Sequence, residues 1–396
     1  MNPVRNTGYK FSNDWISNGM KILGIETSCD ETAASVVQDG RKLLSNVIVS
    51  QIDIHAVYGG VVPEVAARSH IEVINPVINQ ALTDANCTWD DIDAIAVTYA
   101  PGLIGSLLIG MLAARTLAVL HNKPIYPVHH VEAHVYANFI TEVANGKWNM
   151  EDGKSKPIAN SKIPITLHSA PSFPMLALIV SGGHSQLVLF HDHGNYELIG
   201  QTCDDAVGEA FDKVAKIIGL PYPGGPSIAK AALVGNPLAY KLPKSKLSGK
   251  YDFSFSGLKT ATLRAVQREV GVDFTFPSTG LAERLDERKR NDFAASFQRI
   301  AIETLVDQTE KAFNDYKPKS VVIAGGVAAN QELRRILSDR IPINIDYAPM
   351  NLCTDNAAMI ASLGFYFSQK NEPSDPFELE VEPSISMTKT AWNTTL

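Results

Sequence analysis

Two histidines at helical spacing could hold a metal ion. His130 and His134 lie four residues apart in HHVEAHVYANFI, a stretch that could be helix, where residues at i and i+4 share one face. The spacing matches the HExxH pair of zinc peptidases, but Glu132 follows the first histidine by two residues, about 200° around the helix, and would face away from the ion. A peptidase is therefore disfavoured. Asp355 in CTDN is a candidate for the further ligand that a metal needs, and a structural histidine pair is the alternative.

Two glycine-rich turns could bind an anion. VSGGHS (180–185) follows an apolar stretch, and its glycines would let backbone N–H groups approach a phosphate. AGGVAAN (324–330) stands where a helix begins, and helix N-termini favour phosphate or a nucleoside hydroxyl. The P-loop pattern is absent, and either turn could be a plain connection. Asp212, the turn PGGP and the acidic pair Asp30 and Glu31 are further candidates, the pair for binding water or accepting a proton; surface acids and ordinary turns are the alternatives.

The charge distribution limits how the protein could bind nucleic acid. The net charge is −7 at pH 7, which argues against a generally nucleic-acid-binding surface. An RNA contact would need a local basic patch. The segment KLPKSKLSGK (241–250), followed by Lys259, Arg264 and Arg268, is the one stretch of concentrated positive charge. A solvated loop is the alternative interpretation.

Cysteine spacing and hydropathy indicate a cytoplasmic protein. The four cysteines are widely separated and form no CxxC pair, so neither a disulfide framework nor a zinc knuckle is supported. Residues 1–19 contain no apolar segment of the kind found in signal peptides. No apolar run approaches the roughly 20 residues needed to span a bilayer, so we expect no membrane partner.

Two similar units must position these residues. KILGIETSCDETAASVVQ (21–38) and MLALIVSGGHSQLVLF (175–190) each predict a strand, a turn of small residues and a second strand. They suggest an internally duplicated α/β architecture in which one turn from each half faces a common cleft. Two unrelated hairpins are the alternative from pattern alone. Strands alternating with helices between the units favour a mainly parallel or mixed sheet.

Seven stretches in order resemble the TsaD-type tRNA threonylcarbamoyltransferases, once described as O-sialoglycoprotein endopeptidases. They are GIETSCDET, HHVEAH, VSGGHSQL, GEAFDKVAKIIGLPYPGGP, YDFSFSGLKTA, GGVAAN and CTDNAAMIA, spanning about residues 20–370, and the wording is more similar to the bacterial members. The resemblance implies a duplicated actin-like, sugar-kinase-like fold with two lobes around a cleft. It also implies transfer of a threonylcarbamoyl group from threonylcarbamoyl-adenylate to N6 of the adenosine 3′ of the anticodon, in tRNAs that decode codons beginning with A, with release of AMP.

The resemblance implies roles for particular residues and partners. His130, His134 and Asp355 correspond to the ligands of one divalent metal, Fe(II) in preference to zinc, and Asp30 and Glu31 correspond to an acidic turn implicated in catalysis. The implied partners are tRNA, the adenylate, a TsaB-like paralogue bound through the first lobe, and a TsaE-like ATPase. The positions that correspond to contacts with the adenylate are Val180, Ser181, Gly182, Gly183, His184, Asp212, Gly225 and Asn330.

Three other functions stay open on the residues alone. They are a metal-dependent glycoprotein endopeptidase, an actin-fold ATPase or sugar kinase, and a nucleotide-dependent binding scaffold without catalysis. Met20 is a candidate translation start. The organisation that we expect is a leader (1–19), a first lobe (20–140) completed by the helix 355–370, a linker or insertion (141–171), a second lobe (172–354) and a tail (371–396).

Overall fold

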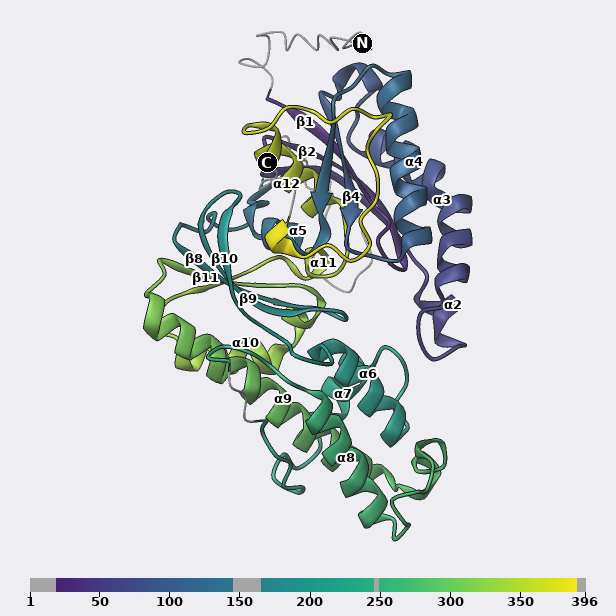
Figure 1. The fold of residues 1–396 in the computed structure, drawn as a ribbon, viewed down its shortest axis with the longest axis vertical. Helices are drawn as coiled ribbons and strands as arrows, with labels where there is room; N and C mark the ends of the chain where they lie inside the picture. The colour runs from purple at the N-terminus through teal and green to yellow at the C-terminus, as the bar shows by residue number, and fades with distance from the viewer. Residues whose placement is uncertain (1–18, 145–164, 246–248, 390–396) are drawn as a thin grey trace, which may run out of the picture.

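The chain forms two lobes, each built on one β-sheet with packed helices (Figure 1). The computed structural model describes residues 19–144, 165–245 and 249–389. The expected leader therefore lies outside the described residues except for Gly19, as do most of the insertion and the last residues of the tail. The two ends of the insertion that are described form short strands at the edge of the first sheet.

The amino-terminal sheet mixes antiparallel and parallel strand pairs, as predicted. Three strands form an antiparallel meander, and two later strands join parallel to the first, giving the order β5-β4-β1-β2-β3-β6-β7. The strands are β1 (Lys21–Glu26), β2 (Glu31–Gln38), β3 (Lys42–Ser50), β4 (Ala94–Ala100), β5 (Ile125–His129), β6 (Glu142–Val143) and β7 (Ile165–Thr166).

The second sheet repeats the first. Its order is β10-β9-β8-β11-β12, with an antiparallel meander followed by two parallel strands, which matches β3-β2-β1-β4-β5 in both order and direction. This repetition confirms the duplicated, actin-like α/β fold and excludes two unrelated hairpins. The strands are β8 (Met175–Val180), β9 (Ser185–Asp192), β10 (Asn195–Gln201), β11 (Ser320–Ala324) and β12 (Ile345–Tyr347).

Helices cover both faces of the amino-terminal sheet, because its central strands are apolar on both faces. Leu23 and Ile25 belong to a core shared with α3 and α4, whereas Ile22 and Val37 belong to a second core shared with α5 and α12. The helix that follows the second sheet thus returns to pack on the first. The helices of this lobe are α2 (Ile52–Ala56), α3 (Pro63–Asp84), α4 (Ile104–Leu120), α5 (His130–Tyr136) and α12 (Ala357–Ser368).

The second lobe is dominated by one long helix, α9, which Asp286 caps by accepting a hydrogen bond from the Lys289 N–H at 2.8 Å. In the ranges that the structure covers, no helix combines the length and apolar character needed to cross a membrane. The helices of this lobe are α6 (Val207–Ile218), α7 (Gly224–Ala232), α8 (Ser256–Glu269), α9 (Glu287–Tyr316), α10 (Gln331–Arg340) and α11 (Met350–Cys353).

Residues 371–389 belong to the segment expected as a tail, and they contact the first lobe. They run over the amino-terminal lobe and end beside α5, in yellow in Figure 1. The Arg115 guanidinium on α4 donates hydrogen bonds to the carbonyls of Pro376, Phe377 and Leu379, and Met387 is only 1% exposed. Satisfied carbonyls and a buried side chain keep this segment in place. We call residues 374–387 the strap.

His193 lies where the two lobes meet. It follows β9 of the second lobe, and its ring stacks on Tyr366 of α12 with centroids 3.9 Å apart. Its Nδ1 lies 3.1 Å from the hydroxyl of Tyr136, and its ring also contacts Phe139. Burial lowers the pKa of His193 to about 4; the nearby Asp192 opposes this shift and Lys370 adds to it. His193 is therefore neutral at pH 7.

Acid should weaken this junction. The unfolded chain, with a histidine pKa of about 6.5, takes up a proton before folded His193 does. Stability contributed by the neutral ring is complete above pH 6.5 and is lost as the pH falls towards 4. We expect His193→Phe to lose less unfolding free energy than the wild type between pH 7.5 and pH 5, measured by urea denaturation. His191→Phe, at the exposed histidine of the same hairpin, is the control; equal losses in the wild type and His193→Phe would contradict this account.

Candidate metal centre and substrate cleft

The two histidines lie on one face of a helix, as the spacing predicted. The helix α5 begins at His130, directly after β5 ends at His129. The imidazole centroids of His130 and His134 are 4.7 Å apart. Asp355, just before α12, completes the group: its Oδ1 is 3.6 Å from the Nε2 of His130 and 3.3 Å from the Nε2 of His134. The three side chains offer ligand atoms within 4.8 Å of one another.

The chemistry of this group fits a divalent cation. Both ring nitrogens of His134 are buried and, within the described part of the chain, neither makes a hydrogen bond; the Nε2 has only its contact with Asp355. Burial lowers the pKa of His130, but the attraction of Glu26 and Asp355 outweighs it and raises the pKa to about 9. The pocket therefore favours positive charge. Two imidazoles and a carboxylate are donors suited to zinc or Fe(II).

Glu132 points away from this group, as its phase on the helix predicted. Its side chain is fully buried, and the hydroxyl of Tyr196 on β10 donates a hydrogen bond to its Oε2 at 3.1 Å. A zincin-type peptidase needs this acid beside the metal, where it would act as general base. The structure thus supports a metal site without the arrangement of that peptidase class.

A cavity of about 820 Å³ lies beside the three side chains, between the lobes. One turn from each half faces it, as predicted from the two similar units. The strap forms part of its wall, which no sequence pattern indicated. The lining includes residues 28–31 and 129–131 of the first lobe, residues 181–184 and Asp212 of the second, Thr354 and Asp355, and residues 383–387 of the strap.

The acidic turn carries its side chains into the cavity lining. Burial, followed by the charges of Asp355 and Asp30, raises the pKa of Glu31 to about 10. In this cluster Glu31 is protonated at pH 7 and can donate a hydrogen bond; a cation held by Asp355 would offset these charges. Burial also raises the pKa of the Cys29 thiol. A neutral thiol is a poor nucleophile.

The glycine turn presents backbone to the cavity. The Ser181 N–H donates to the His184 carbonyl at 2.8 Å, and the N–H groups of Gly208 and Glu209 on α6 donate to the carbonyls of Ser181 and Gly182. An added Cβ on Gly182 or Gly183 would meet no atom within 4 Å. Nothing in the described chain therefore covers the open side of this turn, which suits the close approach of an anion.

The other residues of the VSGGH run have different environments. Val180 ends β8 with a fully buried side chain and can offer only its backbone. His184 lines the cavity, and burial, aided by the charges of His130 and His134, lowers its pKa to about 4. A neutral imidazole at this place can accept or donate a hydrogen bond to a bound ligand.

The structure brings only one of the last three predicted residues into the lining. Asp212 lines the cavity, and its Oδ1 accepts a hydrogen bond from the Gly224 N–H at 2.6 Å. Gly225 lies in the first turn of α7 with open space beside its Cα. Asn330 caps α10 by accepting from the Leu333 N–H at 3.1 Å, and its amide donates to Gln298. Gly225 and Asn330 are outside the described lining, although Gly326 of the Asn330 turn belongs to it.

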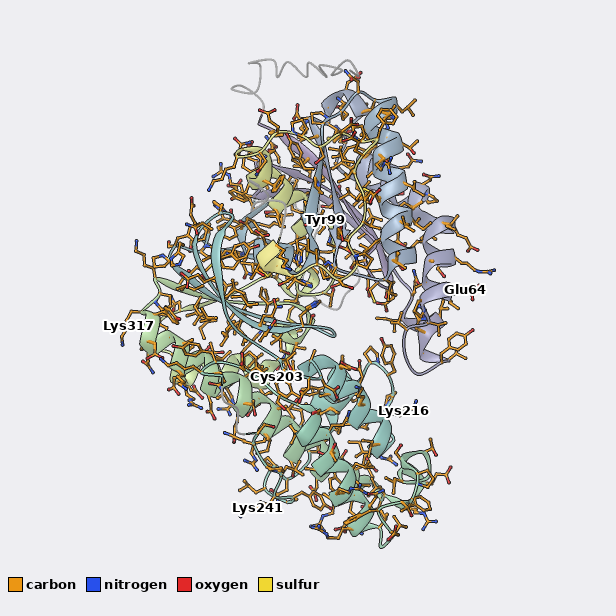
Figure 2. The ribbon with its side chains drawn as sticks, in the orientation of Figure 1. Glu64, Tyr99, Cys203, Lys216, Lys241 and Lys317 are labelled. Carbon is orange, nitrogen blue, oxygen red and sulfur yellow. The ribbon has the colours of Figure 1, made fainter. Side chains whose placement is uncertain are left out.

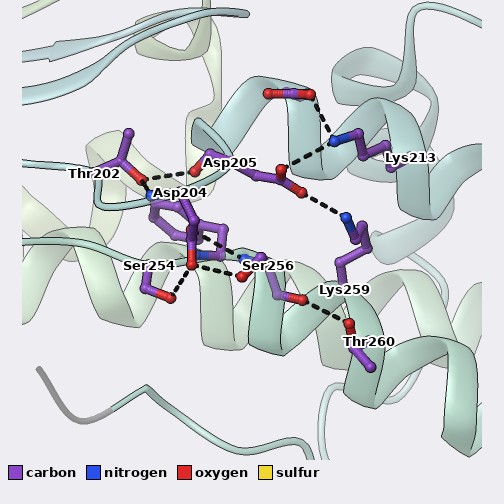
Figure 3. Close-up of polar contacts among 10 residues, drawn as sticks. Thr202, Asp204, Asp205, Lys213, Ser254, Ser256, Lys259 and Thr260 are labelled. Carbon is purple, nitrogen blue, oxygen red and sulfur yellow. Dashed lines mark hydrogen bonds and ion pairs between the residues drawn. The ribbon is translucent and has the colours of Figure 1, made fainter.

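Figure 3 shows a polar network that supports α6 from below. Asp204 accepts hydrogen bonds from the hydroxyls of Ser254 and Ser256, both at 2.6 Å, and from the Phe255 N–H at 2.8 Å. Asp205 pairs with the ammonium groups of Lys213 and Lys259. The motif YDFSFSGLKTA thus holds the segment before α6, and α6 in turn holds the glycine turn.

Ion pairs neutralise part of the basic segment. Lys244 pairs with Asp307 at 2.8 Å, Lys250 with Asp315 at 2.9 Å and Lys259 with Asp205 at 2.8 Å. Figure 2 shows Lys241, the first residue of this segment, at the edge of the second lobe far from the first. Residues 246–248 lie outside the described ranges. These pairs weaken the case for this segment as a nucleic-acid patch.

Comparisons with known proteins agree with the motifs. Residues 42–147 and 160–362 match the family model described as TsaD: tRNA N6-adenosine threonylcarbamoyltransferase. The chain is 46% identical over 375 residues to the enzyme of that name from Thermomicrobium roseum, covering 93% of this chain and 97% of the relative. It is 43% identical over 374 residues to the Bacillus subtilis enzyme of the same name, covering 93% and 96%.

Solved structures show weaker similarity. Full-length HypF, in a phosphate- and nucleotide-bound form, has a TM-score of 0.49 at 12% identity, covering 90% of this chain and 47% of that one. The ROK hexokinase from Thermus thermophilus has a TM-score of 0.39 at 16% identity, covering 89% and 100%. Both TM-scores are below 0.5, so the fold assignment rests on the strand order and not on these two structures.

Proposed function

Because this chain belongs to the family of tRNA N6-adenosine threonylcarbamoyltransferases, we propose that it performs that transfer in the cleft between its lobes. The donor is threonylcarbamoyl-adenylate and the acceptor is N6 of the adenosine 3′ of the anticodon, in tRNAs that decode codons beginning with A. The observation that carries this assignment is the group of His130, His134 and Asp355 in the cavity that the glycine turn also lines. A tRNA substrate also supports a cytoplasmic location.

We assign one divalent ion to these three side chains, Fe(II) in preference to zinc. When bound, it would act as a Lewis acid that stabilises the negative charge developing on the phosphate of the leaving AMP. The donor set supports either metal, because imidazole and carboxylate bind both.

The remaining residues bind and orient the two substrates. The backbone N–H groups of Gly182 and Gly183 in the glycine turn can hold the adenylate phosphate, and Asp212 can accept a hydrogen bond from a ribose hydroxyl. In the reaction, the bond from N6 to the carbamoyl carbon forms while the bond from that carbon to the phosphate oxygen breaks. The N6 proton passes to Asp30 of the acidic turn, or to a water that Asp30 and Glu31 hold. No covalent intermediate is needed.

Family membership favours this transfer over a glycoprotein endopeptidase and over an actin-fold ATPase or sugar kinase. The test is to incubate tRNA with this protein, its partners, threonine, bicarbonate and ATP, and to analyse the nucleosides by mass spectrometry. We expect threonylcarbamoyladenosine in the complete mixture only. Absence of this nucleoside together with a phosphorylated small molecule or a cleaved peptide would favour one of the other activities.

An exposed apolar stripe supports the expected TsaB-like partner. On α4, Ile104, Leu108 and Leu112 follow each other at intervals of four residues, with 60%, 41% and 53% of their surface exposed. Ile71 on the adjacent α3 is 59% exposed. Figure 1 places both helices on the outer face of the first lobe, away from the second. Such a patch is unusual on a monomer and suits the apolar core of a heterodimer interface.

A charge in this stripe should prevent assembly. Leu112→Asp would bury an unpaired carboxylate in the interface, and we expect at least about a tenfold weaker complex with the TsaB-like paralogue. Light scattering coupled to gel filtration checks this on the mixed proteins. Leu238→Asp, at a 74% exposed leucine of the second lobe, should leave the complex intact. Equal assembly of Leu112→Asp and the wild type would exclude this surface.

A further inference from the structure

Glu26 is a buried carboxylate with an unusual set of partners. It is the last residue of β1, and its side chain is fully shielded from solvent. Its Oε1 accepts a hydrogen bond from the Ser28 N–H, and its Oε2 accepts one from the Thr98 hydroxyl on the neighbouring β4, both at 2.5 Å. The same Oε2 lies 3.0 Å from the Nδ1 of His130, and the Ser28 hydroxyl lies 3.2 Å from the same nitrogen. A buried charge with this many donors is held rigidly in place.

These contacts determine which nitrogen of His130 can bind a cation. An ionised carboxylate can only accept hydrogen bonds, so the proton between Glu26 and His130 belongs to Nδ1. The other nitrogen, Nε2, then faces Asp355 at 3.6 Å and His134. His134 lacks such support, because its Nδ1 makes no hydrogen bond within the residues that the structure describes. The two histidines are therefore held to different degrees.

We propose that Glu26 is a positioning residue that fixes the Nδ1–H tautomer and the ring orientation of His130, so that Nε2 is presented to the cation. This proposal depends on the proposed function only because both require His130 to bind a metal ion. Glu26 also balances charge, since a divalent ion together with the Glu26 and Asp355 carboxylates is neutral overall. A carboxylate behind a metal-binding histidine typically strengthens metal binding by about 10- to 100-fold.

The test compares Glu26→Gln with a matched variant, Glu132→Gln. Glu132 is equally buried and lies on α5 itself, but it contacts Tyr196 instead of a metal-binding nitrogen. We expect Glu26→Gln to weaken Co(II) binding by about 10- to 100-fold and to change the visible absorption spectrum of the bound Co(II). Glu132→Gln should change the dissociation constant by less than about threefold, within the scatter of a site left intact. Thermal unfolding of both variants measures how much each substitution lowers the stability of the fold, separately from its effect on metal binding.

A second measurement observes the tautomer directly. In the Zn(II)-loaded wild type labelled with ¹⁵N-histidine, NMR should show a protonated Nδ1 and a metal-bound Nε2 on His130. A metal-bound Nδ1, or Co(II) binding by Glu26→Gln within twofold of the wild type, would overturn the proposal. Failure of the proposed function would look different: tRNA would stay unmodified by the wild type while these metal-binding results were unchanged.

Discussion

Asp355→Ala should remove the metal centre and nearly abolish transfer to tRNA. Asp355 supplies the only carboxylate in the described ligand group and lies within 3.6 Å of both histidines. Lewis-acid stabilisation of the leaving phosphate is worth several kcal/mol, so we expect transfer to fall by about 10³-fold. His134→Ala should act similarly, because its ring nitrogens make no other polar contact in the described structure. Nucleoside mass spectrometry gives the transfer rate, and elemental analysis gives metal per chain.

The control for these variants is a histidine with a structural role. His70 is fully buried but hydrogen-bonded to the Thr32 hydroxyl at 2.7 Å and to the Cys29 carbonyl at 3.0 Å, and it lies outside the ligand group. His70→Gln should lower the unfolding temperature while the folded protein keeps its full metal content. Wild-type metal content and transfer in both Asp355→Ala and His134→Ala would contradict the metal assignment.

Gly182→Ala should lose activity without losing stability. The added methyl meets no atom within 4 Å and the backbone is not left-handed, so the unfolding free energy should change by less than about 0.5 kcal/mol. The methyl would, however, occupy the open side of the turn where we place the adenylate phosphate. We expect kcat/KM for the adenylate to fall by about 10- to 100-fold, equivalent to about 1.4–2.7 kcal/mol. Steady-state kinetics and urea denaturation measure the two effects separately.

Gly208→Ala provides the contrasting result. A Cβ on Gly208 would lie 2.5 Å from the Ser181 carbonyl oxygen and 2.8 Å from the Gly182 Cα, both backbone atoms. The turn or α6 must therefore move, which costs about 1–3 kcal/mol of stability and also displaces the phosphate site. Wild-type kcat/KM in Gly182→Ala would mean that the turn does not bind the adenylate. Equal destabilisation of both variants would contradict the expected difference in stability.

Local patterns were enough to predict much of the fold and site. Apolar stretches around small-residue turns predicted both hairpins, since a strand pair with a tight turn is determined by neighbouring residues. The helical period alone predicted that His130 and His134 lie together and that Glu132 faces away from them. These features depend on residues only a few positions apart.

Features that depend on distant partners were not predictable. The strap is held by backbone carbonyls that accept hydrogen bonds from Arg115. Every residue has a backbone carbonyl, so the sequence does not indicate which ones make these contacts. The ion pairs of Lys244 and Lys250 were not predictable, because their partners Asp307 and Asp315, on α9, lie more than fifty residues after the basic segment. Asn330 caps α10, which is a common local role of asparagine, and its contact with the adenylate stays a prediction. The sequence does mark Glu26 as unusual, because it is a carboxylate at the end of an otherwise apolar strand.

The most direct test of the central claim is a metal titration of the stripped wild-type protein. Chelator-treated protein, with its partners, is supplied with increasing Fe(II) under anaerobic conditions, and threonylcarbamoyladenosine in tRNA is quantified at each metal content. We expect no product without metal and a linear rise in product that ends at one ion per chain. Full product formation by the metal-free protein would contradict it.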